Sequence, residues 1–182
     1  MEHKIKTPLK FEDLKNLKIG DTVKISGYIY TARDAAHARL VDEYKKTGKL
    51  PINIEGEIIY YVGPAPAKPG QVIGSAGPTT SYRMDAYTPT LLDLGLKGMI
   101  GKGARDSSVR ESIKKNKAVY LAAVGGAAAL IAKTIKECEV ILYEDLGPEA
   151  IRKLRVENFP AIVVNDIYGN DLYIENMKSG NK

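Results

Sequence analysis

The segment AVYLAAV, residues 118–124, is a near-continuous run of apolar side chains. Such a run is typical of a β-strand that is buried on both faces, as happens where helices cover both sides of a sheet. Two glycines, Gly125 and Gly126, follow it and lead into a helix expected at 127–137. This part of the chain therefore predicts an α/β fold.

The elements expected on either side of this strand continue the same pattern. After it we expect a strand at 140–143, a short helix at 148–154, a strand at 161–164, a turn at 166–170 and a frayed polar tail at 176–182. Before it we expect a strand at 22–30, a helix at 31–44, strands at 52–62 and 71–76, a helix starting at 88–89, a strand at 99–100 and a helix ending at 117. The early strands are antiparallel in character and the later ones alternate with helices. The chain is therefore expected to form one α/β domain, residues 1–182, with a mixed sheet.

The composition narrows the functional class. A hydrophobic content of 44% is sufficient for a packed core. Cys138 is the only cysteine, so an internal disulfide is impossible and no cysteine-ligated metal or cluster is expected on this chain alone. The amino terminus has no apolar signal segment, and the longest apolar stretch, 118–132, is too short to span a bilayer. We therefore expect a cytoplasmic protein.

The net charge of +5, from 27 basic and 22 acidic residues, allows a function of a different class. A stand-alone basic module could bind nucleic acid or an anionic metabolite. However, the lysines are spread along the chain, and pairs such as 45–46 and 114–115 are typical of solvated helix faces. The absence of tryptophan argues weakly against a stacking platform for bases, although eleven tyrosines leave that argument open.

The segment GPTTSYRM, residues 77–84, concentrates groups that bind anions. It offers backbone N–H groups, three consecutive hydroxyls and the guanidinium of Arg83, which matches a carboxylate in two-pronged geometry. An ordinary tight turn explains Gly77 and Pro78, but it does not explain Arg83 or the third hydroxyl.

Two further segments carry cations at expected strand ends. In TARDAAH, residues 31–37, Arg33 and His37 share a face if the segment is helical, and Asp34 could orient the histidine. An ordinary helix start with an exposed His37 is the simpler interpretation of that segment. In GKG, residues 101–103, flanking glycines permit close approach of a ligand to Lys102, although a plain loop lysine is the commoner case. If these segments converge, their cations could bind both ends of a dicarboxylate.

Together the three segments resemble class I fumarases, in which the same motifs occur in this order and at similar spacing. The match covers about residues 7–171, and it includes VGGAAAL at 124–130 and EDLGPEA at 144–150. The resemblance is to the carboxyl-terminal part of the single-chain enzymes and to the β subunit of two-subunit fumarases and L-tartrate dehydratases.

The resemblance implies a swivelling β/β/α domain and a reversible hydro-lyase reaction. The favoured reaction is hydration of fumarate to malate, and the alternatives are dehydration of L-tartrate and hydration of mesaconate. It also implies a 4Fe-4S cluster that is held by cysteines of a partner α subunit, so that this chain would be a β subunit, inactive alone, in a hetero-oligomer. The single cysteine of the chain agrees with that division.

The resemblance further implies roles for individual residues. Arg33, Arg83 and Lys102 correspond to ligands of the substrate carboxylates. Thr79 matches the position proposed for the base, whereas His37 is chemically the easier base because its usual pKa lies near neutral pH. Both residues are kept as candidates, and no residue of this chain is expected to bind a metal.

Overall fold

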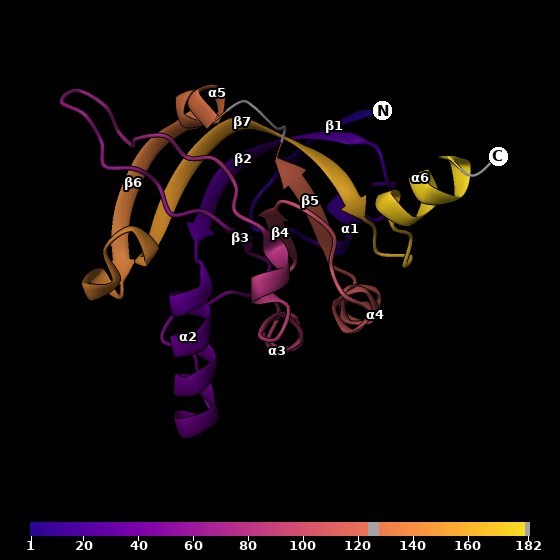
Figure 1. Ribbon diagram of the computed structural model, residues 1–182, viewed down its shortest axis with the longest axis horizontal. Helices are drawn as coiled ribbons and strands as arrows, with labels where there is room; N and C mark the ends of the chain where they lie inside the picture. Colours follow the sequence, from indigo (N-terminus) through magenta and orange to yellow (C-terminus); the bar gives the residue numbers. More distant parts are fainter. Residues whose placement is uncertain (124–127, 181–182) are drawn as a thin grey trace.

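The structure is a computed structural model, and it describes residues 1–123 and 128–180 (Figure 1). The first half contains β1 (Glu2–Lys6), α1 (Phe11–Leu14), β2 (Thr22–Thr31), α2 (Asp34–Thr47), β3 (Ile58–Tyr60), the 3-10 helix η1 (Ser81–Met84) and α3 (Thr88–Asp93). The second half contains β4 (Gly98–Gly101), α4 (Ser107–Asn116), β5 (Val119–Ala123), α5 (Ala128–Thr134), β6 (Ile135–Leu142), the 3-10 helix η2 (Glu144–Glu149), β7 (Ile151–Asn165) and α6 (Leu172–Gly180).

Seven strands form one mixed sheet, which confirms the predicted α/β class. Strands β2, β3, β4 and β5 are successive parallel neighbours. Strand β7 is antiparallel to both β2 and β5, so these five strands close into a ring. Strand β1 lies parallel to β2 outside the ring, and β6 lies antiparallel to β7.

The expectation that the early strands are antiparallel is wrong, since β1 to β5 all run in the same direction. The physical reason lies in the connections. Each of these strands is joined to the next by a long segment that contains helices, such as α2 after β2 and α4 after β4. A crossover of this kind returns the chain to the same edge of the sheet, which is what parallel pairing needs.

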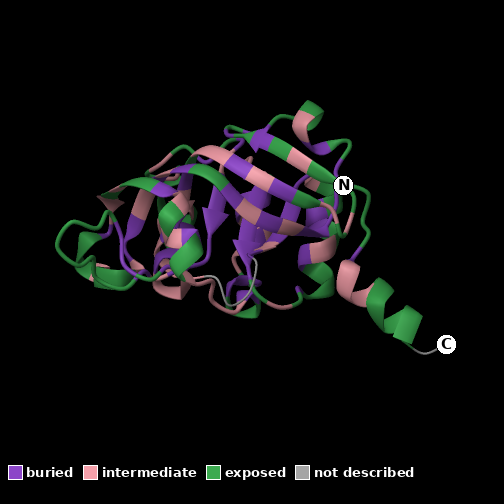
Figure 2. Cartoon of the chain, turned by 90° about the horizontal axis from the view of Figure 1, so that it is seen from above, coloured by how far each residue is buried: buried purple, intermediate pink, exposed green. Residues whose placement is uncertain are grey.

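The central strand of the sequence is buried on both faces over its described residues. Val119 and Leu121 belong to the hydrophobic cluster that fills the ring. Ala118 and Tyr120 belong to a second cluster, between the sheet and helices α2, α3 and α4. Figure 1 shows these three helices together on one side of the strands, and Figure 2 shows that buried residues concentrate on the strands. Val124, Gly125 and Gly126 lie outside the described residues.

Several predicted boundaries were wrong. The strand expected at 52–62 is only Ile58–Tyr60, and residues 71–76 form no strand. The helix expected at 127–137 ends at Thr134, where β6 begins. The helix expected at 148–154 is the end of η2 and the start of β7, because residues 152–155 pair with both β2 and β6. Pairing on two sides outweighs a local helical pattern.

The carboxyl-terminal segment differs from the expected frayed tail. Residues 176–180 continue helix α6, which carries no buried residue. Among the helices in the described part of the chain, none is long and apolar enough to cross a membrane.

Candidate anion-binding site at the carboxyl ends of three strands

The carboxyl ends of β2, β3 and β4 lie at one edge of the sheet. Thr31 pairs with Tyr60, and Tyr60 pairs with Ile100, so the last residues of the three strands are in register. Arg33 and Lys102 each follow two residues after this row. Two strand spacings separate β2 from β4, which places the two backbones about 10 Å apart. Long cationic side chains from both can therefore reach a ligand over β3, where α/β sheets place their sites.

Segment 77–84 is fixed between the extensions of β3 and β4. The backbone N–H and the hydroxyl of Thr79 both donate to the carbonyl oxygen of Tyr61, at 2.8 and 2.9 Å. Thr80 forms a parallel bridge with Lys102, and the N–H of Ser81 donates to the carbonyl oxygen of Lys102 at 2.9 Å. Thr79 and Lys102 are thereby brought to the same edge.

An ion pair joins the same segment to helix α2. Arg83 Nε lies 3.5 Å from Asp34 Oδ2, and both side chains are more than a third exposed. Asp34 is the first residue of α2, directly after Arg33. The three predicted segments, 31–37, 77–84 and 101–103, are therefore neighbours in space, as the dicarboxylate hypothesis requires.

The cations of this edge are only partly neutralised. Arg33 Nε lies 3.9 Å from the carboxylate of Glu149, which is too long for a hydrogen bond. The Arg33 side chain packs on Gly63, where a Cβ atom would lie 2.9 Å from its Nη1. Lys102 is exposed and forms no ion pair with any residue in 1–123 or 128–180. The edge can therefore still accept anionic groups.

His37 has a different environment from the one the sequence suggested, because it is completely buried. Its Nδ1 lies 2.8 Å from the carbonyl oxygen of Arg33. A carbonyl oxygen only accepts, so Nδ1 carries the proton. Nε2 is buried and has no hydrogen-bond partner among the described residues.

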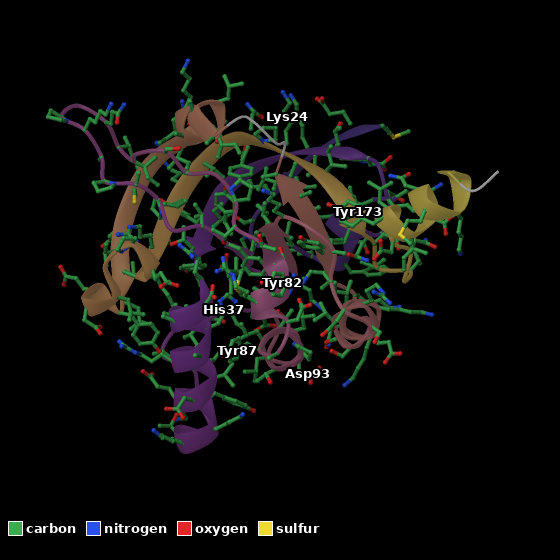
Figure 3. All side chains as sticks on the ribbon, viewed as in Figure 1. Lys24, His37, Tyr82, Tyr87, Asp93 and Tyr173 are labelled. Atoms are coloured by element: carbon green, nitrogen blue, oxygen red, sulfur yellow. The ribbon has the colours of Figure 1, made fainter. Side chains whose placement is uncertain are left out.

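Aromatic rings surround His37 and complete its burial. The imidazole packs edge-on against Tyr61, with 5.4 Å between ring centroids. It also lies beside Tyr87, with 6.2 Å between ring centroids, and Figure 3 labels both His37 and Tyr87. Burial, reinforced by the charge of Arg105, lowers the pKa of His37 from 6.5 to about 4. The ring is therefore neutral at pH 7, and no solvent reaches it in this chain.

Arg105 is a residue of this region that sequence reasoning missed. It is 2% exposed, and its Nε donates to Asp85 at 2.7 Å while Nη2 donates to the hydroxyl of Thr88 at 2.8 Å. Its guanidinium carbon lies 5.1 Å from the ring centroid of Tyr61 and 4.8 Å from that of Tyr120. Because Asp85 lies 20 residues away in sequence, no local pattern could have revealed this buried pair.

A large cavity lies away from the candidate site. It measures about 640 Å³, lies between the loop of residues 65–75 and helix α5, and none of the five predicted site residues lines it. Cys138 lies on β6 and lines a smaller cavity of about 300 Å³. None of the five predicted site residues lines either of these two cavities, so the candidate site lies apart from both, at an edge of the sheet.

The chain matches the sequence model of a family described as the fumarase C-terminus over residues 2–176. L(+)-tartrate dehydratase subunit beta of Escherichia coli K12 is 36% identical over 183 residues, covering 98% of this chain and 90% of that protein. The aerobic class I fumarate hydratase of Escherichia coli K12 is 40% identical over 162 residues, covering 88% of this chain. Fumarate hydratase 2 of Leishmania major is 38% identical over 164 residues, covering 89% of this chain.

The matches differ in how much of each relative the chain spans. It spans 90% of the tartrate dehydratase subunit but only 30% and 29% of the two fumarate hydratases.

Proposed function

Since the chain belongs to the fumarase C-terminal family, we propose that it is the β subunit of an iron–sulfur-dependent hydro-lyase acting on a C4 dicarboxylate. The first candidate reaction is the reversible hydration of fumarate to malate. The second is the dehydration of L-tartrate, which is favoured by the 90% coverage of a tartrate dehydratase β subunit.

One observation carries the proposal: three segments that each carry a cation are neighbours where three parallel strands end. Arg33 follows β2, Lys102 follows β4, and Arg83 is tied to both extensions through Asp34 and Ser81. A C4 dicarboxylate carries two negative groups a short distance apart. Two arginines and a lysine on one edge match that charge distribution, and arginine also fixes the plane of a carboxylate.

These cations have a catalytic role as well as a binding role. Removal of a proton from the carbon next to a carboxylate moves negative charge onto the carboxylate oxygens. Groups that already surround those oxygens stabilise the transition state without having to reorganise. We assign this role to Arg33, Arg83 and Lys102.

We assign proton transfer to Thr79 and a positioning role to His37. Thr79 is only partly buried, and its hydroxyl donates to the Tyr61 carbonyl. To accept the substrate proton, this hydroxyl must first lose its own, and we assign stabilisation of the resulting alkoxide to the positive charge of Lys102 or Arg83. His37 is the stronger base in solution, but its free nitrogen is buried and its pKa falls to about 4 on burial. Its Nδ1–H instead orients the backbone of Arg33.

The donor set of this chain does not fit an iron–sulfur cluster. Cys138 is the only cysteine, and no group of three or more His, Cys, Asp or Glu side chains within 1–123 and 128–180 could hold a metal ion. We therefore assign the expected 4Fe-4S cluster to a partner α subunit, and this chain contributes carboxylate binding and the proton. A position at the edge of the sheet suits a site whose other wall belongs to that partner. A cytoplasmic location is part of the same proposal.

The proposal is tested with the chain purified anaerobically together with its cluster-bearing partner. We expect fumarate hydration by the complex and a fall in kcat/KM of at least a hundredfold in Arg83→Ala. Arg39→Ala, at a residue of α2 that pairs with Asp145, is the matched control and should keep normal activity. A complex that is active with Arg83→Ala would contradict the site assignment.

The same complex identifies the substrate. Fumarate, L-tartrate and mesaconate should be compared by kcat/KM, and the highest value assigns the reaction. Inactivity of the loaded complex toward all three would overturn the proposed function. Salt-dependent binding of the isolated chain to a generic duplex would instead favour the basic nucleic-acid module.

A further inference from the structure

Ser81 and Tyr120 form a continuous set of hydrogen bonds around the backbone of Lys102. The hydroxyl oxygen of Ser81 accepts from the N–H of Lys102 at 3.0 Å, and the N–H of Ser81 donates to the carbonyl of Lys102 at 2.9 Å. The hydroxyls of Ser81 and Tyr120 lie 2.7 Å apart. The Tyr120 hydroxyl also donates to the carbonyl of Gly103 at 2.6 Å.

The direction of every bond in this set is determined. The carbonyl of Gly103 can only accept, so the Tyr120 proton points toward it. The Ser81 proton must then point to the oxygen of Tyr120, and a Ser81 lone pair is left for the amide of Lys102. Burial raises the pKa of Tyr120 above its usual value, so this hydroxyl stays a donor. Both Ser81 and Tyr120 are completely buried.

Local sequence does not fix Lys102, which explains the need for these contacts. The lysine stands between two glycines, which have the greatest backbone freedom of any residue. Gly103 has a φ of +87°, which other residues rarely adopt. At Gly101 a Cβ atom would overlap the Ser81 hydroxyl and would lie 2.7 Å from a ring carbon of Tyr61. Ser81 therefore approaches this backbone as closely as glycine allows.

We propose that Ser81 and Tyr120 are positioning residues for Lys102, and that they set the direction in which its ammonium group meets the substrate carboxylate. The inference rests on the proposed function, because it concerns the same site. Neither residue touches the substrate in this proposal. They act by holding the N–H and the carbonyl of Lys102 and the carbonyl of Gly103.

We call the hydrogen bonds that Ser81 and Tyr120 make around Lys102 the clamp. Arg105 supports both this clamp and the backbone that holds Thr79. The guanidinium of Arg105 packs against the ring of Tyr120 on one side and against the ring of Tyr61 on the other. The carbonyl of Tyr61 receives both hydrogen bonds of Thr79. The buried Arg105 therefore supports Tyr120, which holds the backbone at Lys102. It also supports Tyr61, which holds the backbone and the hydroxyl of Thr79.

The first test uses the complex with the partner subunit and a double-mutant cycle. Ser81→Ala and Tyr120→Phe should each lower kcat/KM about tenfold or more. In a Lys102→Met background they should cost less than about threefold, because the group that they position is gone. Tyr168→Phe is the matched control: its hydroxyl also donates to a backbone carbonyl, that of Lys15 at 2.7 Å, but outside the site. If Ser81→Ala and Tyr120→Phe lower kcat/KM by the same factor in the parent and in the Lys102→Met background, the positioning role is overturned. The two residues would then have only a structural role.

The second test needs no activity, so it separates failure of the clamp from failure of the proposed function. In the isolated chain, amide hydrogen exchange at Lys102 should be at least tenfold faster in Ser81→Ala than in the parent, and unchanged in Tyr168→Phe. Unchanged exchange at Lys102 in Ser81→Ala would overturn the inference whatever the enzyme assay shows. If amide exchange changes as expected but the parent complex is inactive, the proposed function is overturned. The role of Ser81 and Tyr120 in orienting Lys102 toward a substrate is then overturned with it.

Discussion

His37 Nδ1 donates a hydrogen bond to the carbonyl oxygen of Arg33 across 2.8 Å, inside a pocket that solvent does not enter. Arg33 is the residue before the first turn of α2, so the bond fixes the point at which the chain leaves β2. In the proposed site, His37 is therefore a positioning residue for Arg33, and its buried position argues against the alternative role as the base. Its protonation is coupled to folding.

Acid should destabilise the protein through His37. The unfolded chain binds a proton at this residue below about pH 6.5, whereas the folded chain does so only near pH 4, because burial opposes the charge. The contribution of neutral His37 to the free energy of unfolding is complete above pH 6.5. It is lost as pH falls to 4, and the loss is about 3 kcal/mol at 1.4 kcal/mol per pH unit. The free energy of unfolding measured against pH should show this loss, and His37→Gln should remove it. His3→Gln, the change at the other histidine of the chain, should leave the loss in place.

Arg33→Lys should impair the proposed reaction although the charge is kept. Lysine cannot make a two-pronged contact with a carboxylate, so kcat/KM should fall about ten- to a hundredfold, equivalent to about 1.5–3 kcal/mol for a charged hydrogen bond. Arg39→Lys provides the control, since Arg39 of α2 makes a two-pronged contact with Asp145 of η2 at 2.8 and 2.9 Å. Equal activity of Arg33→Lys and the parent complex would remove Arg33 from the site.

Gly101→Ala should destabilise the fold, because the added methyl group would overlap the Ser81 hydroxyl. Overpacking of this kind costs about 1–3 kcal/mol, which chemical denaturation measures directly. The control is Gly180→Ala, at the end of α6, where an added Cβ would meet nothing within 4 Å. A neutral Gly101→Ala would show that the backbone around Lys102 is looser than the described contacts indicate.

Arg105→Met should be among the most damaging single changes. It leaves the Asp85 carboxylate, only 7% exposed, without the cation that it pairs with. Removal of one partner of a buried ion pair costs about 3–5 kcal/mol, because the remaining charge is uncompensated. Denaturant titration of Arg105→Met and of Arg105→Met combined with Asp85→Asn tests this. The double variant should recover part of the loss, and no recovery would contradict the pairing argument.

Tyr82→Ala should weaken assembly with the partner subunit and leave the isolated chain equally stable. Tyr82 is 66% exposed next to Arg83 at the candidate site (Figure 3), and buried tyrosines are frequent determinants of affinity at interfaces. The Kd for the partner, measured by calorimetric titration, should rise at least tenfold. Met177→Ala, on α6 with 69% exposure, is the comparison. An unchanged Kd for Tyr82→Ala would mean that the partner does not cover this side of the site.

The three candidate segments were recognisable because each is local in sequence. The structure brings these segments together at one edge of the sheet, while the roles of Arg33, Thr79, Arg83 and Lys102 in a site stay predictions. The burial of β5 on both faces also followed from its apolar run. The candidate segments and the apolar run of β5 depend on residues that are close together in the sequence. A short stretch of sequence is therefore enough to recognise them.

The sequence by itself determined an α/β chain with a doubly buried strand, cations after two strand ends and in the segment 77–84, and a single cysteine. Only the tertiary structure decided the parallel order of β1 to β5, the closure of the ring by β7, the burial of His37 and the role of Arg105. Each of these depends on partners distant in sequence, such as the pair of Thr31 and Arg152, which are 121 residues apart. Strand pairing and desolvation are set by which distant segments meet, and no local pattern of residues contains that choice.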